Sequence, residues 1–304
     1  MPGEASHPPS KNSESGFPEP PCGLVLVSTP IGNLRDLTPR ARDALQAADL
    51  VLCEDTRRTR KLLAALGIEA RLRSLHDHNE DQRIPEVLDL LRQGKRVALV
   101  SDAGTPLISD PGYRLVRAAI AEELPVGAAP GVNAAVAALA LSGLPPLPFL
   151  VLGFPPPRPG PRRAGFERIR AAERAGLSAT LIWYEAPHRL AETLEDMALV
   201  FGDRPAAVAR ELTKQFEEVR RGTLPALAAH YAASPARGEV TLLAGPASDD
   251  APGLQDLDEA LRQALAAHSL RDAAALVSAA LRLPKKLVYE RALGLQTPIR
   301  RQQE

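Results

Sequence analysis

Short apolar runs alternate with helix-length segments over the first half of the chain. Leu24–Val27, Leu50–Cys53 and Val97–Val100 are continuous apolar runs, the pattern of strands that are buried on both faces. A weaker run covers Leu72–Leu75, and a short strand is expected near Val126. Because helix-like segments separate these runs, the pattern predicts a parallel sheet with helices on both of its faces.

Start and stop signals support the helices of this half. Thr38 is expected to cap a helix that has Pro39 at its first position. Gly67 ends the next helix, and Gly94 ends a helix expected over Ile84–Gln93.

The second half repeats the alternation after Leu144–Pro148, a proline-rich segment typical of a linker. Runs at Phe149–Leu152, Thr180–Tyr184, Ala206–Ala209 and Glu239–Ala244 predict the strands of a second α/β unit. Between the first two of these runs, Gly153–Gly165 is rich in proline and arginine, so we expect a mobile, basic loop there.

Three helix-sized pieces near the C-terminus predict a small helical module, basic near its end, in which a helix-turn-helix-like arrangement is possible. The fold class is therefore α/β with an added helical module. The expected divisions are a disordered tail over 1–21, a first α/β domain over 22–146, a second over 147–247, and the helical module over 254–304.

Composition limits the classes of function. Lysine and arginine total 37, as do aspartate and glutamate, so any nucleic-acid binding must come from local patches. Cys22 and Cys53 are too few for a disulfide or zinc framework. No apolar run reaches roughly 18 residues, and the first residues lack a signal-peptide pattern. We therefore expect a soluble, cytoplasmic protein.

The segment Val97–Gly112, VALVSDAGTPLISDPG, is the most informative stretch of the chain. A buried strand that ends in a polar, glycine- and proline-rich loop is where an open α/β sheet places its ligand. Gly104 lets the backbone approach a ligand closely, and Pro106 and Pro111 stiffen the turn. A tight connection that binds nothing is the alternative.

Further motifs occur in a fixed order with this loop. The motifs are Ser28–Leu34, Glu54–Arg57, Ser101–Gly112, Ala129–Gly131, Tyr184–Arg189 and Arg210–Lys214. Together they resemble the bacterial small-subunit rRNA cytidine 2′-O-ribose methyltransferases, a branch of the tetrapyrrole (precorrin) methylase superfamily. The resemblance covers about Leu24–Leu293, and the first loop lacks the glycine-rich pattern that is usual in the porphyrin branch.

The resemblance implies two α/β/α domains of tetrapyrrole methylase type, a homodimer, and S-adenosylmethionine bound in the cleft between the domains. It implies methylation of a cytidine ribose, cytidine-1402, in 16S rRNA of the small ribosomal subunit. The residues implied to contact the cofactor come from loops of both domains: Pro30, Ile31, Gly32, Asp102, Ala103, Gly104, Thr105, Ile108, Asn133, Ala134, Tyr184 and Leu212.

Methyl transfer to a ribose hydroxyl requires a positioned acceptor and is helped by a base or a cation. Glu211 and Lys214 follow a predicted strand. Glu211 is a candidate proton acceptor, and Lys214 is a candidate either to stabilise the developing alkoxide or to hold a phosphate. Glu185 is a second candidate base. The alternatives are a surface ion network for the first pair and a strand-end hydrogen bond for Glu185.

RNA phosphates are expected to contact local cations, and the acceptor nucleotide must lie in unpaired RNA to enter a cleft. His76, Asp77 and His78 are less favoured as a metal site, because no further ligand cluster is evident and methyl transfer needs no metal. The candidate RNA contacts are Arg57, Arg58, Arg60, Arg158, Arg162, Arg163, Lys285 and Lys286.

Two other functions fit parts of the sequence. A corrin or porphyrin methylase would share the fold but would have little need for a C-terminal helical module with basic ends. A non-catalytic RNA-binding protein would share the RNA surface, and it would give no heat with S-adenosylmethionine in calorimetry.

Overall fold

The computed structural model describes residues 23–247, 254–281 and 283–296. The expected tail over 1–21 lies outside these residues. The chain divides into two compact units, the first ending at Asn133 and the second beginning at Ala134. This division comes earlier than the boundary expected at residue 146, because helix α5 (Ala134–Ser142) contacts the strands of the second unit.

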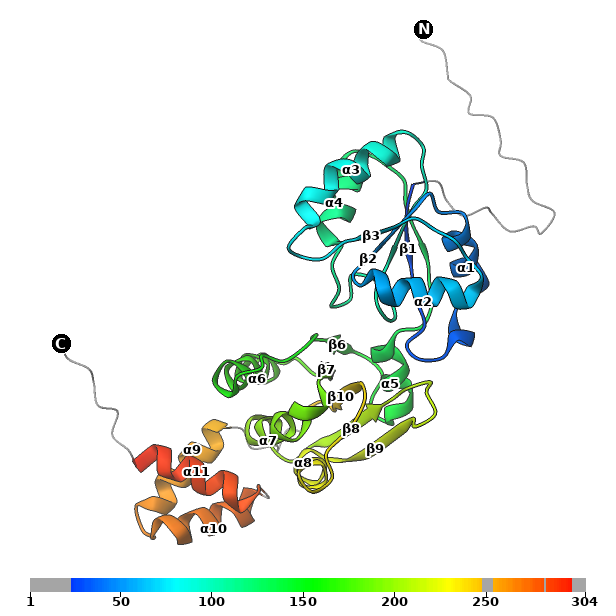
Figure 1. Ribbon diagram of the computed structural model, residues 1–304. Helices are drawn as coiled ribbons and strands as arrows, with labels where there is room; N and C mark the ends of the chain where they lie inside the picture. The colour runs from blue at the N-terminus through cyan, green and yellow to red at the C-terminus, as the bar shows by residue number, and fades with distance from the viewer. Residues whose placement is uncertain (1–22, 248–253, 282, 297–304) are drawn as a thin grey trace. The chain divides into compact units, whose positions relative to one another are not determined.

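The first unit contains a five-stranded sheet in the order β3-β2-β4-β1-β5 (Figure 1). All of its neighbouring strands run parallel, so the predicted parallel sheet is confirmed. The carboxyl ends of the strands consequently meet at one edge, where the loops of the candidate site begin. The strands are β1 (Leu24–Val27), β2 (Leu50–Cys53), β3 (Leu72–Ser74), β4 (Val97–Val100) and β5 (Val126–Ala129).

Helices cover both faces of this sheet because alternate strand residues point to opposite sides. Val27 and Val51 face α1 and α2, whereas Leu24 and Leu52 face α3 and α4. Figure 1 shows these two pairs of helices on opposite faces of the sheet. Each fully buried leucine contributes about 1.5–3 kcal/mol relative to an exposed one. The helices are α1 (Pro39–Gln46), α2 (Thr56–Leu66), α3 (Glu80–Arg92) and α4 (Tyr113–Ala121), with the short 3-10 helix η1 (Leu34–Asp36) before α1.

The predicted helix ends are confirmed where their capping chemistry is local. The Thr38 hydroxyl accepts the N–H of Ala41 at 3.2 Å, and Gly67 closes α2 in the left-handed conformation. Helix α3 begins earlier than expected, at Glu80. The Glu80 carboxylate is buried and accepts the N–H of Leu115 at 2.9 Å, so a contact with α4 fixes the start of α3.

The second unit contains a five-stranded sheet in the order β6-β7-β10-β8-β9. Only β6 and β7 pair in parallel; the other pairs are antiparallel. Strand β9 was not predicted, because its charged side chains suit an edge strand and conceal a buried-strand pattern. The strands are β6 (Phe149–Val151), β7 (Thr180–Glu185), β8 (Pro205–Arg210), β9 (Glu218–Thr223) and β10 (Val240–Ala244).

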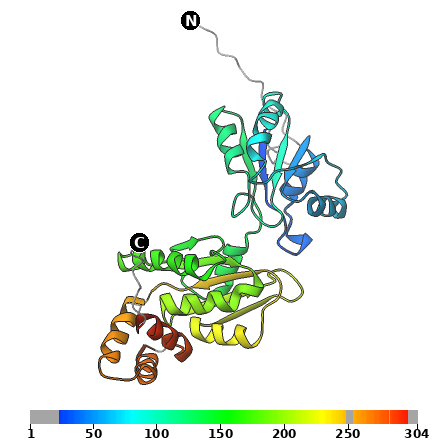
Figure 2. The same cartoon turned by 60° about the vertical axis from the view of Figure 1, so that its left-hand side comes forward.

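One core of this unit lies between the sheet and three helices. Phe166, Trp183 and Phe201 form its aromatic centre, with ring centroids 5.4–6.1 Å apart. Helices α7 and α8 lie side by side (Figure 2). The helices are α6 (Pro159–Arg174), α7 (Leu190–Phe201) and α8 (Leu224–Ala233), and the 3-10 helix η2 (Pro187–Arg189) leads into α7.

The expectation of a mobile loop over Gly153–Gly165 is wrong in its second half. Helix α6 starts at Pro159, immediately after Arg158 at the N-cap position. Proline is well tolerated in the first turn of a helix because the N–H that it lacks has no partner there. Arg162 and Phe166 are spaced one helical turn apart and both are buried, so packing against the core orders this segment.

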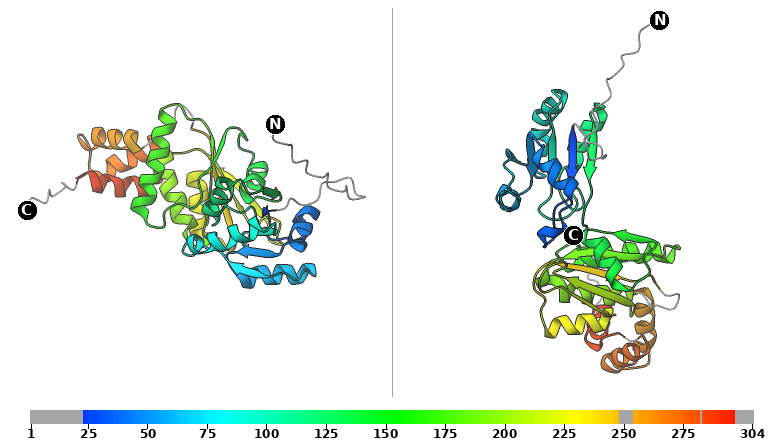
Figure 3. Two further views of the ribbon diagram at one scale, coloured as in Figure 1. Left: turned by 90° about the horizontal axis from the view of Figure 1, so that it is seen from above. Right: turned by 90° about the vertical axis from the view of Figure 1, so that its right-hand side faces the viewer.

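The C-terminal module consists of α9 (Leu254–Leu265), α10 (Leu270–Leu281) and α11 (Lys285–Gln296), drawn in orange to red in Figure 3. The predicted helical module is thereby confirmed. Leu199 of α7 joins the hydrophobic cluster of these helices. Arg291 makes two bonds of 2.7 Å to the carboxylate of Asp258, which link α11 to α9. None of the helices in the described residues is long and apolar enough to cross a membrane.

Candidate cofactor and acceptor site

The loops after β1 and β4 are fixed to each other at the carboxyl edge of the first sheet. Thr29 donates its N–H to the carbonyl of Gly104 at 2.8 Å, and Gly104 returns the bond at 3.0 Å. The hydroxyl of Ser101 donates to the same Gly104 carbonyl at 3.0 Å. Neighbouring loops with this many mutual bonds form a preorganised surface rather than two independent turns.

Two glycines create space where these loops meet the loop after β5. Gly104 has a φ of +80°, and a Cβ there would lie 3.3 Å from Ile31 Cγ2 and 3.6 Å from the carbonyl oxygen of Val132. A Cβ on Gly131 would lie 2.8 Å from the Cβ of Ser28. Three loops therefore converge closely enough that side chains at these glycines would occupy the space between them.

The first unit thus brings together most of the predicted cofactor contacts. Ile31 and Gly104 are buried, and Ile108 is 43% exposed. Two non-glycine residues of the central loop, Leu107 and Ser109, have positive φ angles of 72° and 68°, a conformation that is maintained only when the surroundings enforce it. The predicted contacts in this unit are Pro30, Ile31, Gly32, Asp102, Ala103, Gly104, Thr105, Ile108 and Asn133.

A polar hollow of about 590 Å³ lies beside these loops, at the ends of β2, β3 and β4. Arg57 pairs with Asp55 at 2.8 Å, and Arg58 pairs with Asp102 at 3.2 Å. Two predicted RNA contacts and one predicted cofactor contact therefore share one cavity wall. The hollow is lined by Glu54, Asp55, Thr56, Arg57, Arg58, Ser74, His76, His78 and Asp102.

The histidines of this hollow belong to a turn. The backbone N–H of His76 donates to the amide oxygen of Asn79 at 2.9 Å, and the His76 Nε2 lies 3.0 Å from the Asn79 amide nitrogen. Within the residues that the structure describes, no group of three or more histidine, cysteine, aspartate or glutamate side chains is placed to hold a metal ion.

Asp110 of the central loop lies in an environment that disfavours its ionised form. Burial, reinforced by the carboxylates of Glu54 and Asp102, raises the pKa of Asp110 to about 7. Three acidic groups near one another cannot all ionise freely in a half-buried site. Asp110 therefore changes charge in the neutral pH range.

Replacing Asp110 by asparagine is expected to stabilise the protein above pH 7. Between the ordinary aspartate pKa and about 7, the folded protein holds this proton and the unfolded chain does not. The contribution of Asp110 to the free energy of unfolding therefore falls as the pH rises through this window and is constant above it. We expect Asp110→Asn to match the wild type at pH 4 and to exceed it by up to about 4 kcal/mol at pH 8 in urea unfolding, because a shift of about three pKa units corresponds to that free energy. Asp77→Asn, at an exposed aspartate, is the control variant. If the free energies of unfolding of Asp110→Asn and Asp77→Asn depend on pH in the same way, the assignment to Asp110 is contradicted.

In the second unit, Lys214 is held by two carboxylates. Its ammonium lies 2.8 Å from Glu211 Oε1 and 3.0 Å from Glu239 Oε2. The same Glu211 oxygen accepts the N–H of Glu239 at 3.0 Å. The hydrogen bond from Lys214, with that of the Glu239 backbone, lowers the pKa of Glu211, whereas these carboxylates raise the pKa of Lys214. Glu211 is therefore a weak proton acceptor, and Lys214 is a fixed cation.

Glu185 was a candidate base, with a strand-end hydrogen bond as the alternative role. In the structure, both of its carboxylate oxygens make hydrogen bonds at the end of β7. One carboxylate oxygen accepts the N–H of Ala186 at 2.7 Å and pairs with Arg189 at 2.5 Å. The other accepts the hydroxyl of Thr193 at 2.6 Å. The side chain is buried, so its lone pairs hold the turn into α7 rather than face a substrate.

The two cofactor candidates on the strand ends of this unit lie at one edge of its sheet. Glu185 and Arg210 both pair with Val240 of β10, so the ends of β7 and β8 are level. Tyr184 precedes Glu185, and its ring centroid lies 5.6 Å from that of Phe154. Leu212 follows Arg210 in the chain and is buried. Ala134, the remaining candidate, opens α5.

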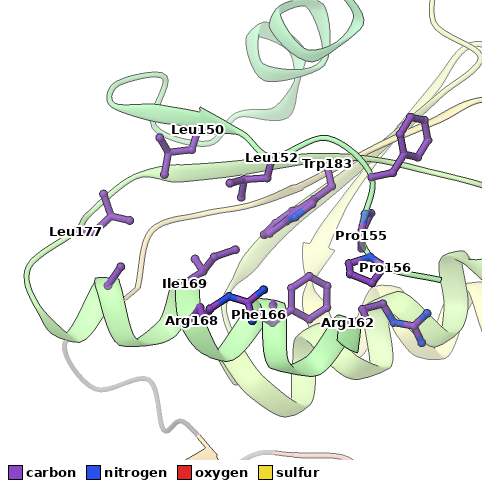
Figure 4. Close-up of a pocket in the computed structure, with 13 residues that line it drawn as sticks. Leu150, Leu152, Pro155, Pro156, Arg162, Phe166, Arg168, Ile169, Leu177 and Trp183 are labelled. Atoms are coloured by element: carbon purple, nitrogen blue, oxygen red, sulfur yellow. The ribbon is translucent and has the colours of Figure 1, made fainter. Parts of the chain in front are cut away.

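An apolar hollow of about 400 Å³, which no sequence motif indicated, lies between α6, β6 and β7 (Figure 4). Trp183, Phe166 and Leu152 line it, together with Arg162 and Arg168. None of the predicted cofactor contacts lines this hollow, although Phe154, whose ring lies against Tyr184, does.

The remaining RNA candidates differ in their exposure. Arg158 and Arg60 are exposed, as are Lys285 and Lys286 at the start of α11. Arg162 is 1% exposed.

Arg162 therefore cannot present its guanidinium to RNA. It lies 2.6 Å from Asp196, and Arg163 lies 2.5 Å from the other oxygen of the same carboxylate. The buried ion pair with Asp196 thus withdraws Arg162 from the surface, whereas Arg158 and Arg163 keep exposed side chains.

Comparison with known proteins places the chain in a family. Residues 23–228 match the family described as tetrapyrrole (corrin/porphyrin) methylases, and residues 251–296 match the RsmI C-terminal HTH domain. A "ribosomal RNA small subunit methyltransferase I" from Mesorhizobium japonicum is 46% identical over 90% of this chain and 92% of its own length. The chain belongs to the tetrapyrrole methylase family, in the branch of the ribosomal RNA small subunit methyltransferases I. A second member, from Pseudomonas aeruginosa, is 44% identical over 90% of this chain and 97% of its own.

Solved structures support the fold of this family member. The methyltransferase CobJ aligns over 75% of this chain and 95% of its own, with a TM-score of 0.54 at 21% identity. A diphthine synthase aligns over 73% and 89%, with a TM-score of 0.56 at 15% identity. At these identities the similarity concerns the fold alone.

Proposed function

We propose that this protein transfers a methyl group from S-adenosylmethionine to the 2′-hydroxyl of a cytidine ribose, cytidine-1402, in 16S rRNA. The observation that carries the proposal is the cradle around Gly104, formed by three loops in a chain that is 46% identical to a named rRNA methyltransferase. The match of residues 251–296 to the RsmI C-terminal domain favours rRNA over a tetrapyrrole as the acceptor.

The cradle suits a cofactor that must lie against the backbone. S-adenosylmethionine supplies a methyl carbon on a sulfonium, which is open to in-line attack by an oxygen. The left-handed backbone of Gly104 and the close approach of Gly131 to Ser28 leave room that a Cβ would fill. We propose these loops as the cofactor contacts in the first unit, and Ala134, Tyr184 and Leu212 as the contacts in the second.

On the acceptor side we propose Lys214 as the group that meets the reacting oxygen. A protonated ammonium would stabilise the alkoxide that forms when the 2′-hydroxyl gives its proton to solvent water. That alkoxide would take the methyl group from the sulfonium, and the neutral thioether would be the leaving group. Glu211 and Glu239 hold this ammonium from two sides, so its position is set before the acceptor arrives. The lowered pKa of Glu211 supports a positioning role for this carboxylate rather than the role of general base.

RNA phosphates are proposed to bind at exposed cations of both units. Arg57 and Arg58 border the polar hollow, and Lys285 and Lys286 open the last helix. Phosphate contacts of this kind position an RNA without reading its sequence. We also propose a cytoplasmic homodimer; the exposed apolar side chains of Val136 and Leu141 on α5 support a further contact surface.

The proposal is tested by methylation with labelled S-adenosylmethionine. Small ribosomal subunits and naked 16S rRNA from cells lacking the modification are the two acceptors, and nuclease mapping locates the modified ribose. We expect label on the 2′-oxygen of one cytidine. Label on a base, or no transfer to either acceptor together with methylation of a porphyrin substrate, would contradict the proposal.

Replacing Lys214 by alanine is expected to reduce turnover more than cofactor affinity. We expect kcat to fall about 30-fold, or roughly 2 kcal/mol, because a positioned charge is lost from the acceptor side. The Kd for S-adenosylmethionine should remain within about threefold of wild type. Steady-state kinetics and calorimetry measure the two effects, and Glu239→Gln is the milder companion variant because Glu211 still holds the ammonium. A wild-type rate in Lys214→Ala would remove this residue from the site.

A further inference from the structure

We infer that Phe216 stacks on an unpaired nucleobase of the RNA substrate and that Arg237 binds the adjoining phosphate. The inference rests on the proposed function, since it assigns the RNA contact of the same enzyme. Neither residue belongs to the motifs that the sequence analysis singled out. Both were identified from the edge of the second sheet at which the structure places them.

Phe216 and Arg237 lie at the same edge of the sheet as Lys214. Phe216 lies in the loop between β8 and β9, whose flanking residues Arg210 and Glu218 pair with each other. Arg237 precedes β10, whose first residue, Val240, pairs with Arg210. A Cβ on Gly238 would lie 2.2 Å from Glu211 Oε1, so the segment that carries Arg237 touches the loop that carries Phe216.

The loop that presents Phe216 is held rigidly by its own hydrogen bonds. Glu217 accepts the N–H of Thr213 at 2.6 Å through its carboxylate, and its own N–H reaches the carbonyl of Lys214 at 3.2 Å. Glu211 and Thr213 adopt positive φ angles of 51° and 66°. Strained backbone of this kind costs about 1–3 kcal/mol per residue and collects at functional sites. The strain therefore supports a loop that is shaped to display a side chain.

Phe216 is 66% exposed, and within the described part of the chain its ring contacts no other aromatic ring. A large aromatic ring left in water at the tip of an ordered loop lacks a folding role. Unpaired RNA bases are recognised chiefly by stacking on aromatic side chains, and the acceptor nucleotide must be unpaired to reach an enzyme site. Phe216 is therefore suited to stack on an unpaired base rather than to contact an RNA duplex.

Arg237 supplies the charge that an RNA strand needs beside such a ring. It is exposed, and no hydrogen bond or ion pair engages its side chain among the described residues. The nearby carboxylates are already occupied: Glu239 holds Lys214, and Glu218 holds Arg210 at 2.6 Å. An uncommitted cation at the same sheet edge as an exposed ring favours a polyanion with bases over an apolar protein surface.

The first test distinguishes the loss of base stacking from the loss of any exposed apolar side chain. Phe216→Ala is expected to raise the KM for the RNA acceptor by about 5- to 150-fold, with the Kd for S-adenosylmethionine unchanged. Phe216→Tyr should restore the wild-type KM, whereas Phe216→Leu should not. Ile120→Ala is the matched control, since Ile120 is 61% exposed at the end of α4. An effect of Phe216→Ala no larger than that of Ile120→Ala overturns the inference.

The second test measures stacking without turnover. Trp183 is the single tryptophan of the chain and is 2% exposed, so Phe216→Trp introduces one accessible reporter. A single-stranded oligoribonucleotide of about 15 nucleotides should quench this new fluorescence, and the same sequence as a duplex should not. Adding Arg237→Ala should weaken binding and reduce the salt dependence by about one phosphate contact. Arg71→Ala is the control and should leave both unchanged, because Arg71 is an exposed arginine of the first unit, directly before β3.

The outcomes distinguish this inference from the proposed function. If wild-type protein neither binds S-adenosylmethionine nor methylates rRNA, the proposed function fails. If it does both and the Phe216 variants retain the wild-type KM, only the stacking inference fails. If Phe216→Ala weakens binding to assembled subunits but not to single-stranded RNA, the ring contacts a ribosomal protein and the inference is overturned.

Discussion

Replacing Gly104 by arginine is expected to abolish S-adenosylmethionine binding while leaving the protein folded. A side chain at this position enters the space between Ile31 and Val132, which a Cβ alone approaches to within 3.3 and 3.6 Å. We expect the affinity to fall at least about 100-fold, or roughly 2.7 kcal/mol, in calorimetry. The positive φ of Gly104 adds strain of about 1 kcal/mol, which a protein of this size tolerates.

A second glycine provides the matched control for this experiment. Gly94, at the end of α3, has a φ of +73°, close to the +80° of Gly104, but a Cβ there meets nothing within 4 Å. Gly94→Arg therefore imposes similar backbone strain without filling the cradle. It should bind S-adenosylmethionine as the wild type does. If both variants lose binding equally, strain is the cause and the placement of the cofactor is wrong.

The fold of the first unit was predictable because its signals are local. Runs such as Val97–Val100 are buried on both faces, and end signals such as Thr38 and Gly67 act within one turn of a helix. The failures came where contacts distant in the chain decide the structure. Helix α3 begins at Glu80 because a contact with Leu115 holds it there, and the sequence around Glu80 contains no trace of that partner.

The sequence motifs pointed to Gly104 and Lys214 as candidate site positions, but they did not indicate the contacts around them. The structure shows a cradle at Gly104 and an ammonium held by two carboxylates at Lys214. The protonation state of Glu211 depends on Lys214 and on the backbone of Glu239, which lies 28 residues away. Spacing within a motif carries no information about such a partner. Phe216 was missed for a related reason, since only its exposure sets it apart.

Arg162 shows most clearly how charge in a sequence differs from charge on a surface. The segment around it looked like a basic loop, yet its guanidinium is buried against Asp196. We expect Arg162→Met to lower the free energy of unfolding by about 3 kcal/mol, because it leaves a buried carboxylate without its main partner. Methionine preserves most of the buried volume, so the loss reports the charge rather than a cavity.

The exposed neighbour Arg158 separates the two roles of arginine in this segment. Arg158→Met should change the free energy of unfolding by less than about 0.5 kcal/mol. The Arg158 side chain is exposed, and only the backbone of this residue takes part in the cap of α6. If Arg158 contacts an RNA phosphate, the same change should weaken RNA binding and reduce its salt dependence by about one contact. Chemical denaturation and salt titrations measure the two effects. A stable, fully folded Arg162→Met with weakened RNA binding would reverse the assignment, because it would mean that the buried ion pair opens to bind RNA.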